Sequence, residues 1–288
     1  FENSIVVDGT YQDGTQPNDA LLLQQDSSKN VYIRNMNSQP VYMGSNNQNF
    51  WKLTPAGDFE LSTTDVVERG IDVRNGYIKT VSNVCVGNGA GRLTPAGGDR
   101  VAVGTNAGYQ SQGNNTIAIG NSAGRNAQNA DAVAVGQGSA FNNQGSSAVA
   151  FGTDAGRIDQ GVDSVAVGLR SGFSNQGSSA VAIGKLAGRL SQNRGAIAVG
   201  FRAGSNDQGD YAVAIGVDTG RTNQGNNGIA IGAGAARTSQ NNLSLAIGYN
   251  AGRNAQGTSA VAIGTDAGLN DQGDRSVAIG LRAGQTDQ

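Results

Sequence analysis

A four-residue sequence motif, which we call the word, dominates the chain from residue 101 onward. Large apolar residues alternate with small ones in it. The word is first complete at Val101, Ala102, Val103 and Gly104, and it returns every sixteen residues without insertion or deletion. Its twelve closing glycines are Gly104, Gly120, Gly136, Gly152, Gly168, Gly184, Gly200, Gly216, Gly232, Gly248, Gly264 and Gly280. Alternation with a period of two predicts a β-strand with two different faces, and a fixed short repeat is typical of stacked coils. We therefore predict an all-β parallel β-solenoid built from sixteen-residue coils.

Alanine occupies the centre of the word in every copy. Counted from the closing glycine, positions −3 and −1 hold Val, Ile, Leu or Phe, and position −2 holds alanine. These alanines are Ala102, Ala118, Ala134, Ala150, Ala166, Ala182, Ala198, Ala214, Ala230, Ala246, Ala262 and Ala278. A strand position that faces water would vary, and Thr suits a strand better than Ala. Burying two large apolar residues contributes ~3–6 kcal/mol, whereas ordering sixteen residues costs ~1–2 kcal/mol for each. Because one chain alone looks short of core, we predict that the alanine face packs against other copies of the chain.

Glutamine occupies position +8 in every copy. The column comprises Gln112, Gln128, Gln144, Gln160, Gln176, Gln192, Gln208, Gln224, Gln240, Gln256, Gln272 and Gln288. Stacked in register, these amides can form a ladder in which each side chain donates to the next. A repeated sugar-binding site is the alternative, but a residue that never varies is better explained by the scaffold.

Two further positions carry turn chemistry. Position +4 is glycine in most copies, and a bend this tight uses the positive φ that glycine permits. Position +9 is Gly or Asn, the latter at Asn129, Asn193 and Asn241. Because Asn tolerates the left-handed region best among non-glycine residues, we predict a positive φ at position +9 as well.

Residues 1–80 are predicted to form a short-stranded β module. Six apolar runs bounded by Gly, Asn, Asp or Pro predict strands at 4–7, 20–23, 31–34, 41–43, 50–53 and 70–73. The aromatic residues gathered here are expected to form the core of this module, with a carbohydrate-stacking face as the alternative. Residues 81–100 are predicted to be a junction with an imperfect first coil, and 101–288 to be the twelve regular coils. In the imperfect coil Cys85 stands in the alanine column, where we expect a small buried side chain.

Composition and charge exclude several classes of function. The 288 residues carry a formal net charge of −2, which gives no electrostatic reason to expect nucleic acid or an anionic membrane as partner. No apolar run approaches the ~20 residues of a membrane helix. The sequence begins with Phe1 rather than methionine, so we expect a processed product or a piece of a longer protein.

Catalytic chemistry is poorly represented as well. Histidine is absent and Cys85 is the single cysteine, so the commonest general base, a disulfide within the chain and a thiolate cluster are all missing. Asp154, Asp159, Asp163 and Asp266 fall at variable positions and give no paired acid and base. We therefore expect no enzyme activity, no cofactor and no metal site.

The repeat resembles a known family. Residues 180–184, Ala-Val-Ala-Ile-Gly, followed by Ala187 and Gly188, resemble the YadA-like head repeats of trimeric autotransporter adhesins. Because those heads are left-handed parallel β-rolls packed as trimers, the resemblance implies a left-handed solenoid and a homotrimer. It covers residues 84–288. The coil is longer than in the adhesin heads, and with the pair Gln176 and Gly177 the repeat is closer in style to surface glycoproteins of large algal viruses and to phage fibres.

These observations favour a structural role. We expect a non-enzymatic fibre or spike protein on a virion surface, acting as a rigid rod for host attachment. The alternative is a bacterial trimeric autotransporter-type adhesin head that binds matrix protein or glycan. Expected partners are other copies of the chain, a host-surface glycan or receptor, and other virion or envelope proteins through the N-terminal module. Neither nucleic acid binding nor membrane insertion is expected, the location is the virion or the outer cell surface, and no receptor-binding residue is assigned.

Overall fold

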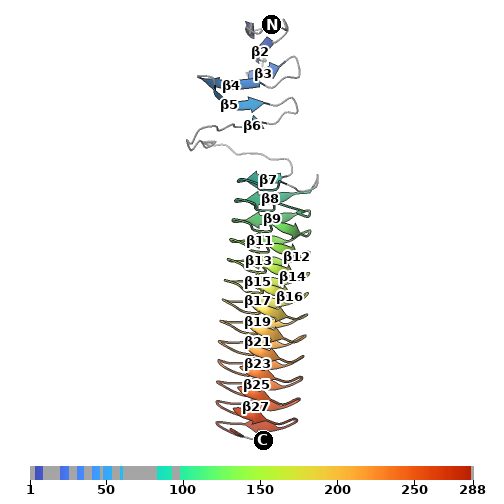
Figure 1. Cartoon of the computed structure of the whole chain (residues 1–288), viewed down its shortest axis with the longest axis vertical. Coiled ribbons are helices and arrows are strands. Elements are labelled where there is room, and N and C mark those ends of the chain that lie inside the picture. The colour runs from blue at the N-terminus through green and yellow to red at the C-terminus, as the bar shows by residue number, and fades with distance from the viewer. Residues whose placement is uncertain are drawn as a thin grey trace. The chain divides into compact units, whose positions relative to one another are not determined.

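A computed structural model of the chain describes residues 4–8, 20–25, 31–35, 41–45, 48–53, 59–60, 83–92 and 98–286 (Figure 1). The chain divides into two compact units, Phe1–Ile78 and Lys79–Gln288. All the regular elements in the described ranges are strands, as expected for an all-β chain.

The N-terminal unit contains two small antiparallel sheets. Strands β1 (Ser4–Asp8), β2 (Ala20–Gln25) and β3 (Val31–Asn35) form one sheet, and β4 (Val41–Ser45), β5 (Gln48–Leu53) and β6 (Phe59–Glu60) form the other. Five of the six apolar runs coincide with β1 to β5, whereas β6 was not predicted. The run at 70–73 and the packing of the aromatic side chains lie outside the residues that the structure describes.

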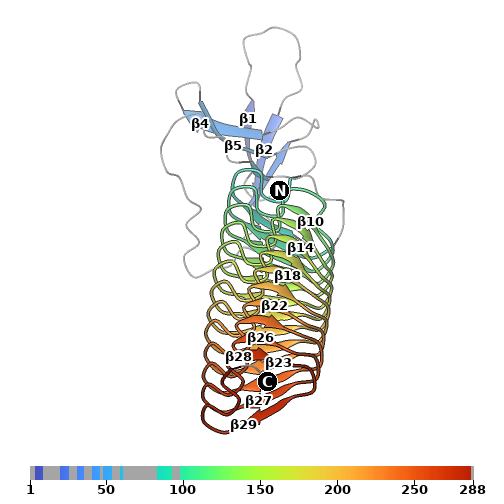
Figure 2. The same ribbon diagram turned by 60° about the horizontal axis from the view of Figure 1, so that its bottom comes forward.

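The apolar words of the second unit form one parallel sheet of thirteen strands. Its members are β7 (Asn83–Val86), β8 (Arg100–Val103), β9 (Thr116–Ile119), β11 (Val133–Val135), β13 (Val149–Phe151), β15 (Val165–Val167), β17 (Val181–Ile183), β19 (Ile197–Val199), β21 (Val213–Ile215), β23 (Ile229–Ile231), β25 (Leu245–Ile247), β27 (Val261–Ile263) and β29 (Val277–Ile279). From β8 onward each strand pairs with residues sixteen further along, as Ala166 does with Ala182. The predicted parallel solenoid of sixteen-residue coils is therefore confirmed (Figure 2).

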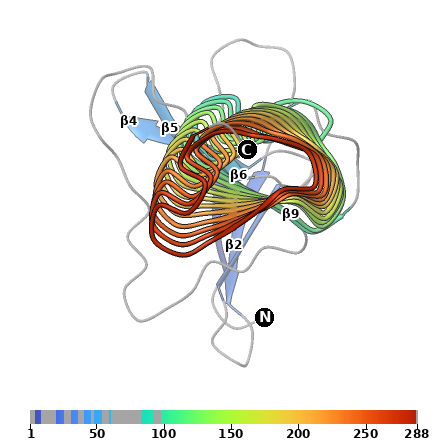
Figure 3. The ribbon, with the colours of Figure 1, turned by 90° about the horizontal axis from the view of Figure 1, so that it is seen from below.

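A second parallel sheet, of ten strands, closes the other side of each coil and was not predicted. Its members are β10 (Asn126–Gln128), β12 (Asn142–Gln144), β14 (Ile158–Gln160), β16 (Ser174–Gln176), β18 (Leu190–Gln192), β20 (Asn206–Gln208), β22 (Thr222–Gln224), β24 (Thr238–Gln240), β26 (Asn254–Gln256) and β28 (Asn270–Gln272). These strands cover positions +6 to +8. Seen along the stack, successive coils follow nearly the same path, with a small progressive shift (Figure 3).

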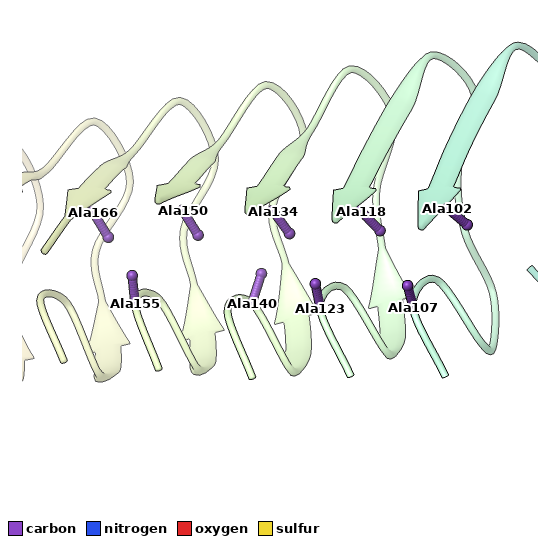
Figure 4. Close-up of a cluster of buried hydrophobic side chains, with 9 residues drawn as sticks. All are labelled: Ala102, Ala107, Ala118, Ala123, Ala134, Ala140, Ala150, Ala155 and Ala166. Carbon is purple, nitrogen blue, oxygen red and sulfur yellow. The ribbon is translucent and has the colours of Figure 1, made fainter. Parts of the chain in front are cut away.

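The interior of the stack consists mainly of alanine and glutamine, with a few serine and threonine side chains. Ala118 at position −2 and Ala123 at position +3 come from opposite sides of the coil and point toward each other, and neither is exposed (Figure 4). The same pairing of small residues recurs along the stack, with Ser139, Ser171 and Thr219 replacing alanine at position +3 in three coils. Since two methyl groups fill the gap, no large apolar side chain fits between the two sides.

This packing corrects the prediction for the alanine column. The alanines from Ala102 to Ala278, at sixteen-residue intervals, are 0–1% exposed within a single chain, so they are covered by their own coil and not by a partner. The Val and Ile side chains at −3 and −1 are the ones that point outward. The alternation correctly predicted that the two faces of the strand differ. The prediction that other copies of the chain cover the alanine face was wrong.

The prediction of a positive φ at position +9 was wrong. The glycines at that position, Gly177 among them, do not have a positive φ. A Cβ added at Gly177 would lie 2.6 Å from the backbone N of Arg194, so glycine here allows close approach of the next coil. The left-handed residues are instead at +2, +7 and +11, for example Asp154, Asp159 and Asp163, with φ of 55°, 53° and 57°.

At position +4 the prediction of positive φ is confirmed. Gly188 has φ of 51°, and Ala140, one of two alanines in this column, has φ of 45°. A Cβ at Gly188 would also lie 2.5 Å from Oε1 of Gln192, so the glycine makes room for the buried glutamine.

Candidate functional site

The glutamine column lies inside the stack and ties the two sides of each coil together. Gln192 is fully buried, and its Nε2 donates to Val181 O at 2.8 Å, to Ala196 O at 3.1 Å and to Gln208 Oε1 at 3.1 Å. The side chain therefore bonds a carbonyl of the opposite strand β17 and links one coil to the next. Buried amides that keep their hydrogen bonds stabilise a core, whereas unpaired ones destabilise it.

The ladder runs through most of the described column. Glutamine donates to glutamine between Gln112 and Gln128, between Gln144 and Gln160, and at every step from Gln176 to Gln256. Oε1 of Gln112, Gln144, Gln176 and Gln272 accepts no hydrogen bond among the described residues, so the ladder is interrupted between these runs. Gln288 lies outside the described residues. Every described glutamine of this column is at most 2% exposed, so the side chains are committed to the interior of the stack.

The outward face of the thirteen-stranded sheet is apolar along its whole length. Positions −3 and −1 carry Val, Ile, Leu or Phe from coil to coil, and none of these side chains is buried in the single chain. Phe151 is 55% exposed, Ile183 41% and Ile215 40%. We call this surface the apolar wall. A continuous apolar surface of this kind marks an interaction site.

One bend of the coil, positions +1, +2 and +5, carries cations and aromatic rings. At +5 aromatic and basic residues alternate through Tyr109, Arg125, Phe141, Arg157, Phe173 and Arg189. Arg157 lies between two rings, with its Cζ 5.4 Å from the Phe141 centroid and 5.7 Å from that of Phe173. It also pairs with Asp154 at 3.2 Å, and Arg170 of the next coil reaches the same carboxylate at 3.5 Å. Stacking and ion pairing hold this row of side chains in place.

The opposite bend, positions +7 to +11, is polar and contains a groove. The groove has a volume of about 520 Å³ and is lined by side chains such as Asp207, Asn223 and Asn242. Side chains at +10 accept hydrogen bonds from the backbone of the preceding coil. For example, Asn226 N donates to Asn242 Oδ1 at 2.8 Å. The exposed amides, hydroxyls and carboxylates can hydrogen-bond a polar ligand, but no aromatic or cationic residue lines the groove.

The carboxylates considered from the sequence are not brought together. Asp154 and Asp266 lie on the basic bend, whereas Asp159 and Asp163 lie on the opposite one. Within the described ranges no group of three or more Cys, Asp or Glu side chains is placed to hold a metal ion. The same residues include no helix with the length and apolar character needed to span a bilayer.

Cys85 departs from its expected environment. It pairs in register with Ala102 and thus stands in the alanine column, but its side chain is exposed as a free thiol. Its strand, β7, is the last of the sheet on that side, so no further coil covers it in the described structure.

Comparison of the chain with models of protein families, with curated proteins and with solved structures finds no match.

Proposed function

We propose that the chain is a non-enzymatic structural fibre or spike protein that forms a rigid rod on a virion surface and holds the particle to its host. Copies of the chain associate in parallel through their apolar walls as a homotrimer of left-handed solenoids, the arrangement of the adhesin heads that the repeat resembles. The N-terminal unit then joins the rod to other virion proteins.

The regularity of the stack is the observation that carries this proposal. Twelve coils follow one another with the same register, and even the bends are bonded between coils, as where Leu186 N donates to Leu169 O at 3.0 Å. A stack bonded at every level resists bending, which suits a spacer. The apolar wall supports self-association, since side chains as exposed as Phe151 and Ile183 are stabilised when a partner covers them.

The test combines hydrodynamics with imaging. We expect sedimentation equilibrium of the wild-type chain to give a discrete oligomer, and electron microscopy to show straight rods. Replacing Ile183 and Ile215 by lysine should raise the dissociation constant at least ~100-fold, since two apolar contacts worth ~1.5–3 kcal/mol each are lost. The matched control, Asn121→Lys with Gln137→Lys, adds the same charge at exposed positions away from the wall, in the column where Lys185 occurs naturally. A monomeric wild type, or wall variants that associate like the control, would contradict the proposal.

The biological owner is tested separately. An antibody against the coils should label intact virions in electron micrographs. Labelling of a bacterial envelope instead would favour an adhesin head, for which binding of the purified chain to matrix protein or glycan is the direct assay.

A further inference from the structure

The charged side chains of the solenoid are sorted by sign. All the charged residues between 104 and 286 lie on one of the two bends. The first bend, positions +1, +2 and +5, carries ten cations and three aspartates, a net charge of +7. The second bend, positions +7, +10 and +11, carries seven aspartates and two arginines, a net charge of −5. The near-neutral net charge of the chain therefore conceals two bends of opposite net charge.

The members of each edge are as follows. The first bend holds Arg125, Arg157, Arg170, Lys185, Arg189, Arg202, Arg221, Arg237, Arg253 and Arg282 with Asp154, Asp218 and Asp266, and the second holds Asp131, Asp159, Asp163, Asp207, Asp210, Asp271 and Asp274 with Arg194 and Arg275.

Cations of the first bend and aspartates of the second bend are both concentrated in the coils from Gly152 to Gly200, although the coil of Gly184 carries Arg194 and no aspartate on its second bend. Arg170, Lys185, Arg189 and Arg202 belong to the three coils from Gly168 to Gly200, and the four aspartates from Asp159 to Asp210 belong to coils within that range or next to it. Two of the three aspartates on the first bend are already paired, Asp154 with Arg157 and Arg170, and Asp218 with Arg202 and Arg221. Among the described residues, no ion pair involves an aspartate of the second bend.

Because the two bends carry opposite net charge, the parallel arrangement of neighbouring copies is electrostatically favoured over the antiparallel one. If copies stand parallel and at the same height with their apolar walls facing a common axis, the first bend of each copy adjoins the second bend of the next. If instead two copies face each other antiparallel, like bends adjoin. Opposite charges attract and like charges repel across such edges, which affects specificity more than affinity.

We propose that the basic first bend of one copy faces the acidic second bend of its neighbour, and that this pairing makes association parallel and in register. The inference rests on the proposed self-association through the apolar wall. The wall supplies most of the affinity, and the edges exclude the antiparallel alternative. Since exposed ion pairs are screened within about 10 Å at 0.1 M salt, the selection is strongest at low ionic strength.

The chain itself supplies substitutions suited to a charge-reversal test. Arginine occurs naturally at +10 as Arg194 and at +11 as Arg275, the latter with φ of 59°, so Asp210→Arg and Asp163→Arg place arginine where the fold accepts it. On the first bend Lys185→Glu and Arg189→Glu reverse two cations that take part in no ion pair described above. Circular dichroism at 0.5 M salt checks that every variant is folded.

Association is then measured by sedimentation velocity at 50 mM and 500 mM salt. Either pair of reversals should weaken association at least tenfold at 50 mM salt and much less at 500 mM. The four substitutions together restore opposite signs and should recover wild-type association to within threefold. If the wild type associates and the reversed variants do so equally well, or if the fourfold variant is not rescued, the edge pairing is overturned while the proposed assembly stands. A monomeric wild type overturns both.

Orientation is measured through the natural thiol. Cys85 is exposed at one end of the sheet, and the far strand, β29, lies about 58 Å away at ~4.8 Å per strand. Donor and acceptor dyes on Cys85 of different copies should therefore transfer energy efficiently in a parallel assembly and weakly in an antiparallel one. Weak transfer overturns the inference. So does heparin binding by the assembled wild type that is lost in Lys185→Glu with Arg189→Glu, since it would show the basic bend open to a polyanion.

Discussion

Gln192 donates its side-chain amide to Oε1 of Gln208, sixteen residues further on, over 3.1 Å and inside the stack. The same amide nitrogen reaches Val181 O across the coil at 2.8 Å. One side chain thus links two coils to each other and the two sides of one coil. Because a buried amide cannot exchange these bonds for water, its removal leaves several polar groups unsatisfied.

Replacing Gln192 by leucine should be strongly destabilising. The substitution keeps the volume roughly constant but leaves Val181 O and the Gln208 amide without this partner, at a cost of about 2–4 kcal/mol. The measurement is guanidinium denaturation followed by circular dichroism. Gln137→Leu is the matched control, because Gln137 is exposed and its replacement should change stability by less than ~0.5 kcal/mol. Equal effects at the two sites would show that the ladder does not contribute to stability.

Two glycines of one coil should respond very differently to alanine. A Cβ at Gly184 would lie 2.7 Å from the backbone O of Gly200, and its φ of 123° suits glycine alone. Gly184→Ala should therefore cost more than ~3 kcal/mol. Gly188→Ala meets the movable end of Gln192, and natural alanines occupy the same column, so it should cost about 1 kcal/mol. Chemical denaturation of both variants gives the comparison, and a reversed order would refute the packing described for Gly184.

Enlarging the alanine column should disrupt folding of the single chain. Ala182 is 0% exposed between the two sides of its coil, so Ala182→Leu forces overpacking that costs at least ~3 kcal/mol. Val181→Leu, the control, enlarges an adjacent side chain on the apolar wall and should change stability little. Thermal unfolding at a concentration where the chain is monomeric makes the test. A stable Ala182→Leu monomer that merely fails to associate would restore the alanine column to an interface between chains.

Thiol reactivity distinguishes the end of the alanine column from its middle. Cys85 is exposed and should react stoichiometrically with a chromogenic disulfide reagent in the native protein. In a Cys85→Ser background, a cysteine introduced by Ala182→Cys should react only on unfolding, because Ala182 is fully enclosed. Protection of Cys85 in the native chain would show that its strand is covered.

The alternating strand pattern predicted the sixteen-residue coil, but it did not predict which face of the strand points into the coil. The recurrence of Val181, Ala182 and Ile183 gave the period, the parallel sheet and a strand with unlike faces. Which face lies inside depends on the spacing between the two sides of the coil, and that spacing is set by the second sheet. Its strands, such as β20 at Asn206–Gln208, consist mostly of polar residues without an apolar period, so they gave no strand signal.

The left-handed backbone positions were also recognisable only in part. Asn129, Asn193 and Asn241 suggested a positive φ at +9, where glycine in fact serves the close approach of the neighbouring coil. The +11 column, which includes Asp131 with φ of 60°, is rich in Asp, Asn and Ser and carried the relevant signal. The two charged bends could have been recognised by tabulating charge against position within the coil, because net charge alone conceals them.

Because each coil from Gly104 onward bonds its neighbours in the same sixteen-residue register, the solenoid can change length without redesign, provided that it does so in whole coils. Insertion or loss of another number of residues within a strand would shift its downstream side chains to the opposite face or out of line with the neighbouring coil, whereas the offset of 17 residues between β7 and β8 shows that a bend can absorb one extra residue. The length of the solenoid therefore changes in steps of ~4.8 Å. Duplication or deletion of gene segments that encode whole coils would alter it during evolution.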